Sequence, residues 1–255
     1  MSPLKIACKL ILFIVFFSNS STFALVDASE VLKKSQQKIK SKDDSATVKM
    51  VIVDTDGSTK ERVLVIKRKM NQKHMTLVKL KKPTDLKGTA LLNIIEKGEL
   101  SQWLYLPSTK QVRRVMGQKK STGILGSELS SEDLDLNTIK GAKPRLIKEA
   151  VIDNEPTALI EVKSDSNNTQ YSKALLWISI KTYLPFKVEY FNKTNKAIKR
   201  IAFENYKLIN GTFRAQSIKI KNLINQRGTE LYFSDLKSNS GLTDDEFSQR
   251  ALTRE

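Results

Sequence analysis

The sequence predicts a mainly β fold of the α+β class, in which short antiparallel strands form one large sheet. Apolar and polar residues alternate with a period of two along most of the chain, in about a dozen short segments. Turn residues separate these segments at short spacing, which is typical of hairpins. Helical periodicity is confined to segments near the two ends and to one short central stretch. A sheet this large tends to curl or to close on itself.

The segment 27–40 is expected to be an amphipathic helix. Asp27 is its expected N-cap, and one face carries Ala28, Val31, Leu32, Ser35 and Ile39. The period then changes to two. Asp54 to Gly57 predict the first hairpin turn. Strands are expected at 46–53, 62–69, 74–80, 90–95, 100–106 and 111–116.

A loop rich in Gly, Ser and Thr at 117–131 interrupts the alternation. A short helix is expected at 131–139, with acidic residues in its first turn. Thr243 and Glu246 form a capping box that opens a closing helix, with Phe247 and Leu252 facing inward. Between these helices, strands are expected at 145–152, 158–162, 174–180, 186–191, 199–206, 213–223 and 228–236.

Residues 1–24 have the pattern of a secretory signal peptide. Lys5 and Lys9 precede an unbroken apolar run at 10–17, and Thr22-Phe23-Ala24 fits a cleavage site. A membrane anchor is the alternative, but spanning takes about 20 apolar residues and this run is much shorter. Cys8 lies before the run, so the mature chain would contain no Cys, which fits the bacterial periplasm. No Pro- or Ser-rich linker divides residues 25–255, and we expect them to form a single domain.

The composition excludes several classes of site and partner. The chain has 44 Lys plus Arg and 27 Asp plus Glu, for a net charge of +17. One Cys and one His exclude a disulfide framework and a Cys- or His-rich metal site, and no cofactor is expected. A nucleic-acid partner is not expected, because neither a basic helix nor an aromatic cluster typical of RNA-binding strands accompanies the charge. Attraction to an anionic envelope surface remains open.

The sequence gives little sign of catalysis. It contains no Gly-x-Ser-x-Gly elbow, no Walker loop and no Gly-x-Gly-x-x-Gly motif. Paired carboxylates for glycoside hydrolysis are one interpretation of the acids after the central loop. Charge at a helix N-terminus, in a solvated loop, explains them better. These acids are Glu128, Glu132, Asp133 and Asp135.

Two central strands are apolar on both faces. The segment 90–95 has no polar face, and 103–106 is similar. An antiparallel strand of this kind must be covered on both sides. Either core packing on both faces or a ligand cavity on one face explains the pattern, and the residues by themselves favour core packing.

Trp103, Tyr105, Arg113 and Arg114 form a denser set near these strands. Trp103 and Tyr105 share one strand face, whereas the two arginines point to opposite faces of the next strand. One arginine is therefore expected to reach the acids after the loop. Such an Arg–carboxylate pair would hold the loop against the sheet and could gate a cavity.

Three motifs follow one another in the centre of the chain: PTDLKGTALL at 83–92, WLYLP at 103–107 with VRRV at 112–115, and GSELSSEDL at 126–134. Trp177, Lys199, Thr229 and the segment 247–252 continue the pattern. Together they resemble the LolA-like family of periplasmic outer-membrane lipoprotein-sorting proteins, in its longer subgroup associated with RND-type exporters. The chain differs from the family pattern at Glu128, Leu129 and Ser131.

The resemblance implies a curled, incomplete antiparallel β-barrel of about 11–12 strands with helices covering its concave side. It also implies a carrier that shields acyl chains in an apolar cavity and has no catalytic residues. The motif positions give the expected ligand-binding residues: Leu92, Ile94, Trp103, Tyr105 and Trp177. They also give the expected residues of a gating loop: Arg113, Arg114, Gly126, Ser127, Glu132 and Asp133.

Three functions follow as hypotheses. The first is a monomeric periplasmic carrier for a lipoprotein or lipid, which exchanges its cargo with an inner-membrane RND-type transporter. Lipoprotein, glycolipid, sterol-like lipid and hydrophobic signal all remain open as cargo. The second is an adaptor that binds a transporter or an anionic surface and needs no cavity. The third, an envelope hydrolase, requires acids converging in a cleft.

Overall fold

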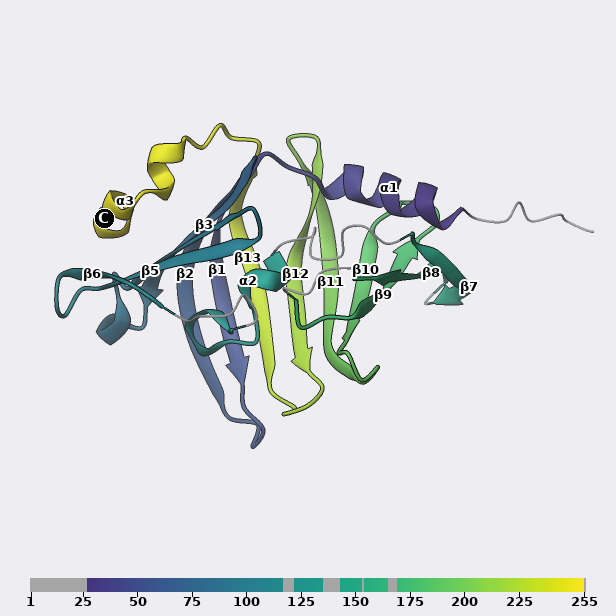
Figure 1. The fold of residues 1–255 in the computed structure, drawn as a ribbon, viewed down its shortest axis with the longest axis horizontal. Helices are drawn as coiled ribbons and strands as arrows, with labels where there is room; N and C mark the ends of the chain where they lie inside the picture. Colours follow the sequence, from purple (N-terminus) through teal and green to yellow (C-terminus); the bar gives the residue numbers. More distant parts are fainter. Residues whose placement is uncertain (1–26, 117–121, 135–142, 153, 165–168, 255) are drawn as a thin grey trace, which may run out of the picture.

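The computed structural model describes residues 27–116, 122–134, 143–152, 154–164 and 169–254. These residues form one antiparallel sheet of thirteen strands, in the order β6-β5-β4-β3-β2-β1-β13-β12-β11-β10-β9-β8-β7 (Figure 1). β6 and β7 are the end strands and do not pair with each other, so the sheet is curled and open. The strands are β1 Asp43–Val53, β2 Thr59–Met70, β3 Lys73–Lys82, β4 Ala90–Glu96, β5 Glu99–Leu106, β6 Gln111–Arg114, β7 Arg145–Ile152, β8 Glu155–Lys163, β9 Lys173–Ser179, β10 Pro185–Phe191, β11 Ala197–Ile209, β12 Thr212–Asn222 and β13 Gly228–Ser238.

The predicted fold class is confirmed, with thirteen strands where about 11–12 were expected. The predicted signal peptide at 1–24 lies outside the described residues. The expected helix at 131–139 is represented by the single turn α2, Ser131–Leu134, and the rest of that segment also lies outside them.

One face of the sheet carries the main core. Because side chains alternate along a strand, register decides which of them meet. Val48 lies opposite Leu64, and Met50 opposite Leu231. We call this side the inner face and the other the outer face. The inner face carries the fully or almost fully buried residues Val48, Met50, Leu64, Val78, Ile201, Ile220 and Leu231.

Helix α1, Ala28–Ile39, covers part of the inner face. Asp27 caps it as predicted, because its carboxylate accepts a hydrogen bond from the Ser29 N–H at 2.8 Å. Ala28 and Val31 pack with Ile160 and Ile178 of β8 and β9. The helix also contacts β12 and therefore bridges one half of the curled sheet (Figure 1).

The C-terminal helices lie on the outer face. The 3₁₀ helix η3, Asp244–Phe247, has the predicted capping box, and α3, Gln249–Thr253, follows it. Phe247 and Leu252 are buried with Leu77 and Leu92, whose side chains point away from the inner face. Of the helices in the described part of the chain, α1 and the two short turns η2 (Ile124–Gly126) and α2 lie on the concave side, where the resemblance implied that helices would cover it. No helix in the described part of the chain is both long and apolar enough to cross a membrane.

Candidate functional site

An apolar cavity lies between α1 and the inner face. Its volume is about 230 Å³. Leu32 and Ile39 of α1 form one wall, and aliphatic and aromatic side chains of the sheet form the other. The sheet contributes Ala46, Ile66, Val162, Leu176, Val188, Tyr190, Ile201, Phe203, Tyr206, Phe213, Ile218, Ile220, Leu231, Phe233 and Leu236. The cavity is thus suited to hydrocarbon, since few of its lining groups are polar.

The central loop folds over the inner face and closes one end of the cavity. We call residues 122–134 the inner loop. Gly123 is required there, because a Cβ at this position would lie 1.9 Å from the Ser127 carbonyl oxygen. Gly126 has φ +77°, a conformation that glycine adopts readily. Ile124 and Leu129 are buried in the main core, and Leu129 also lines the cavity.

Glu128 connects the inner loop to β12 and β13. Its backbone N–H donates to the hydroxyl of Thr229 at 2.9 Å. Its carboxylate accepts from Asn222 Nδ2 at 2.8 Å and from Arg227 Nη1 at 3.1 Å. The Glu128 side chain is 10% exposed and that of Arg227 is 30% exposed, so this ion pair is partly shielded from solvent and holds the loop in place.

Asp133 connects the loop to β11. Lys199 Nζ lies 2.7 Å from one carboxylate oxygen, which also accepts from the N–H and the hydroxyl of Ser130. The other oxygen accepts from the Tyr171 hydroxyl at 2.8 Å. Burial, reinforced by Asp133, raises the pKa of Tyr171 well above its ordinary value, so this phenol remains a donor. Tyr171 stacks on Tyr190, whose ring lines the cavity, with centroids 4.2 Å apart.

Further side-chain hydrogen bonds hold the rest of α2. Asn93 Nδ2 of β4 donates to the Ser131 hydroxyl at 2.7 Å, and Gln102 Nε2 donates to Asn93 Oδ1 at 2.7 Å. The Thr169 hydroxyl donates to the carboxylate of buried Glu132. Glu128, Glu132 and Asp133 are therefore structural anchors, and Asp135 lies outside the described residues. In the described residues they do not converge in a cleft as a free carboxylate pair.

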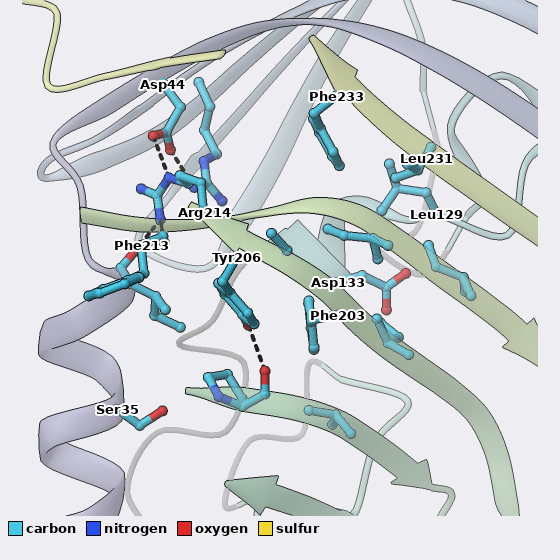
Figure 2. Close-up of a pocket in the computed structure, with 18 of the residues that line it drawn as sticks. Ser35, Asp44, Leu129, Asp133, Phe203, Tyr206, Phe213, Arg214, Leu231 and Phe233 are labelled. Atoms are coloured by element: carbon cyan, nitrogen blue, oxygen red, sulfur yellow. Dashed lines mark hydrogen bonds and ion pairs between the residues drawn. The ribbon is translucent and has the colours of Figure 1, made fainter. Parts of the chain in front are cut away.

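A charged cluster lines another part of the cavity, beside the C-terminal end of α1 (Figure 2). We call Asp44, Arg68 and Arg214 the Asp44 cluster. Arg214 Nε lies 2.8 Å from Asp44 Oδ1, and Arg68 Nη2 lies 2.5 Å from Asp44 Oδ2. Arg214 Nη1 also donates to the carbonyl of Ile39, the last residue of α1. Burial tends to raise the pKa of Asp44, but the two guanidinium groups outweigh it and lower the pKa to about 2.

Four of the residues expected to bind ligand lie away from this cavity. Leu92 and Ile94 point to the outer face, because their neighbours Leu91, Asn93 and Ile95 occupy the opposite side of β4. Trp103 and Tyr105 lie opposite Leu92 and Ala90 in the register and pack in the same outer cluster, beneath α3. The fifth, Trp177, also lies on the outer face, where Lys187 Nζ is 3.8 Å from its ring centroid.

The predicted arginines and the loop residues separate in the structure. Arg113 donates to Gln111, and Arg114 lies over the Trp103 ring at 5.9 Å; both are exposed. Lys199 and Arg227 pair with the loop acids in their place. Of the gating candidates, Gly126, Ser127, Glu132 and Asp133 all belong to the inner loop, and Asp133 lines the cavity.

Sequence reasoning missed the Asp44 cluster. Its members lie far apart in the sequence and come from β1, β2 and β12, and no motif marks them. The strand alternation is the one signal for these residues, because side chains two positions apart on a strand share a face. Asp44 is two residues before Ala46 and Arg68 is two residues after Ile66, and both Ala46 and Ile66 line the cavity. Among the described residues, no group of three His, Cys, Asp or Glu side chains is placed to hold a metal ion.

Known proteins share this architecture. The profile of a protein family described only as uncharacterized protein-like matches residues 72–254. A putative outer-membrane lipoprotein-sorting protein domain from Vibrio parahaemolyticus superposes with a TM-score of 0.78, at 28% identity, over 88% of this chain and 97% of its own. The chain belongs to a LolA-like family. The family resemblance seen in the sequence motifs is thereby confirmed.

Two further structures share the fold of this LolA-like chain. A DUF1329 family protein from Desulfovibrio piger gives a TM-score of 0.79 at 24% identity, over 88% of this chain and 97% of its own. A LolA superfamily protein from Nitrosomonas europaea gives a TM-score of 0.69 at 23% identity, over 89% of this chain and 99% of its own. No curated protein sequence matches the chain.

Proposed function

We propose that this protein is a non-enzymatic periplasmic carrier that shields an acyl chain of a lipoprotein or lipid during transport toward the outer membrane. The cavity between α1 and the inner face carries the proposal, because its walls are mostly apolar. Each CH₂ removed from water there contributes about 0.8 kcal/mol. The similarity to the Vibrio lipoprotein-sorting domain supports the same class of cargo.

Release of cargo requires the cavity to open, and α1 is the element suited to move. Only Ala28, Val31 and Ser35 of this helix are buried. Its C-terminal end is held by Arg214 on the Ile39 carbonyl and by the Thr212 hydroxyl on the Lys40 carbonyl at 3.2 Å. The inner loop, in contrast, is held by the buried Lys199–Asp133 ion pair and by the partly buried Arg227–Glu128 ion pair. We therefore assign α1 as the lid and the inner loop as a fixed end of the cavity.

The proposal includes export through residues 1–24 and one functional domain at 25–255. It also includes exchange of cargo with an inner-membrane RND-type transporter. A carrier that moves between the inner and outer membranes must not stay attached to the inner membrane, so cleavage of the signal peptide suits this role. We also expect the carrier to be a monomer.

Native mass spectrometry of mature protein purified from its own envelope, followed by lipid extraction, tests the proposal. We expect an acylated ligand at about one per chain. Ile218→Trp should abolish this ligand, because Ile218 lines the cavity. Lys219→Trp is the matched control, since Lys219 is the adjacent residue of β12 and is exposed on the outer face. A ligand-free protein that also rejects added acyl probes would contradict the carrier function and favour the adaptor hypothesis.

A further inference from the structure

We propose that the cavity selects acyl ligands with a negatively charged head group, a carboxylate or phosphate, and that Arg214 and Arg68 bind this group. The proposal rests on the carrier function and adds the chemical class of the cargo. It follows from the charge balance of the Asp44 cluster, from the hydrogen bonding of Arg214 and from the position of the cluster in the wall of a mostly apolar cavity.

The Asp44 cluster carries excess positive charge. Among the three side chains of this cluster, two guanidinium groups meet one carboxylate, which gives these three groups a balance of +1. Both oxygens of Asp44 are already fully used. Oδ1 accepts from Arg214 and from the Ser238 hydroxyl at 2.6 Å, and Oδ2 accepts from Arg68 and from the Ser41 hydroxyl at 2.7 Å. One carboxylate balances the charge of only one of the two guanidinium groups. The side chains of both arginines are at most 19% exposed.

Arg214 retains one donor group without an acceptor. Its side chain is 11% exposed, its Nε pairs with Asp44, and its Nη1 donates to the carbonyls of Ile39 and Phe213. Nη2 is buried and has no hydrogen-bond partner within the described residues. A buried donor without an acceptor is costly, and a charged donor more so. An anionic oxygen beside Arg214 would supply the acceptor and balance the charge in a site largely shielded from water.

The rest of the cavity fits the chain of such a ligand. Tyr206, which also lines the cavity, already donates to the Pro185 carbonyl at 2.6 Å. Asp133, the second acid that lines the cavity, is paired with Lys199. Figure 2 shows Asp44 and Arg214 at one end of the pocket, and Leu129, Leu231 and Asp133 at the other. A cavity of about 150 Å³ holds benzene, so about 230 Å³ corresponds to roughly nine carbons of a single chain.

Calorimetric titration of the mature protein with ten-carbon probes tests the selection. The probes are decanoate, decyl phosphate, decanol and decyltrimethylammonium, with acetate and inorganic phosphate as chain-free anions. We expect both anionic amphiphiles to bind at least about tenfold more tightly than decanol, and the cationic probe not to bind. The chain-free anions should not displace decanoate, because the hydrocarbon contributes most of the affinity.

Each result separates this proposal from the carrier function. Equal binding of decanol and decanoate would overturn the head-group selection and leave the acyl cavity intact. Displacement of decanoate by acetate or phosphate at similar concentration would overturn the acyl class and indicate a small-anion site. If no ten-carbon probe bound, whatever its head group, the carrier function itself would fail.

Variants assign the selection to the arginines. Arg214→Gln should reduce the preference for decanoate over decanol to about twofold or less. Arg214 also holds α1, so Arg68→Gln is the second variant, and it should reduce the preference without removing the bond to Ile39. Arg200→Gln is the control, because Arg200 pairs with Glu189 on β10 at 2.7 Å and lies outside the cavity. An unchanged preference in both cluster variants would overturn the assignment.

Discussion

Lys199 Nζ lies 2.7 Å from Asp133 Oδ2, and the two side chains are only 7% and 1% exposed. The pair joins β11 to the inner loop across 66 positions of the sequence. Both residues belong to the motif positions that identified the family. In the structure they fix one end of the cavity.

Removing either partner of this pair should destabilise the protein strongly. We expect Lys199→Met or Asp133→Asn to lower the free energy of unfolding by about 3–5 kcal/mol, because each variant leaves the other partner as a buried charge without its counter-ion. The double variant should lower the free energy of unfolding by less than the sum of the two single variants. Urea unfolding measures all three. The exposed pair Lys219–Glu204 is the control, and Lys219→Met there should cost less than about 1 kcal/mol.

Asp44 should make the stability depend on acid pH. Its pKa is about 2 in the folded protein against an ordinary 3.8. The lowered pKa means that its contribution is fully present above about pH 4 and is lost as the pH falls through about 2. The shift corresponds to about 2 kcal/mol. Asp44→Asn should be less stable than wild type at neutral pH, and the difference should narrow by about 2 kcal/mol between pH 4 and 2 in chemical denaturation. Parallel curves would contradict this.

The N-cap of α1 should control exchange of an acyl probe. Asp27→Ala removes the acceptor for the Ser29 N–H and should cost about 1 kcal/mol of helix stability. We expect faster hydrogen exchange of the α1 amides and faster release of bound decanoate by stopped flow. Asp56→Ala is the matched control, since Asp56 accepts from the Ser58 N–H at 2.9 Å in the β1–β2 turn, far from α1. Equal release rates in the two variants would contradict the assignment of α1 as the lid.

The outer cluster should matter for stability and not for ligand binding. Leu252 is 1% exposed and packs in the cluster that contains Leu92 and contacts Trp103. Leu252→Ala should cost about 2–5 kcal/mol through the cavity that it leaves. It should also change the tryptophan emission, because Trp103 lies in the same cluster. Titration with decanoate should give an unchanged affinity. A large loss of affinity in folded protein would instead support Trp103 and Tyr105 as ligand-binding residues.

Much of the fold could be predicted from the sequence for local reasons. Alternation located the strands, since a half-buried strand must place every second side chain on one face. The cap at Asp27 and the capping box at Thr243 depend on residues three or fewer positions away. The motif at 126–134 marked the inner loop, because Gly126 and the buried hydroxyl of Ser127 have local backbone roles.

The location of the site depended on tertiary structure. The pattern at Leu92 and Trp103 shows that these side chains share a face of the sheet, but it does not say which face encloses the cavity. The curl of the sheet and the docking of α1 and α3 on opposite faces decide that. Asp44, Arg68 and Arg214 become neighbours only when β1 pairs with β2 and β13, and β12 with β13. Local sequence patterns were therefore sufficient to predict the strands, the caps and the family. The pairing of distant strands and the curl of the sheet decided which charges meet and where hydrocarbon is shielded, because these depend on contacts between residues far apart in the chain.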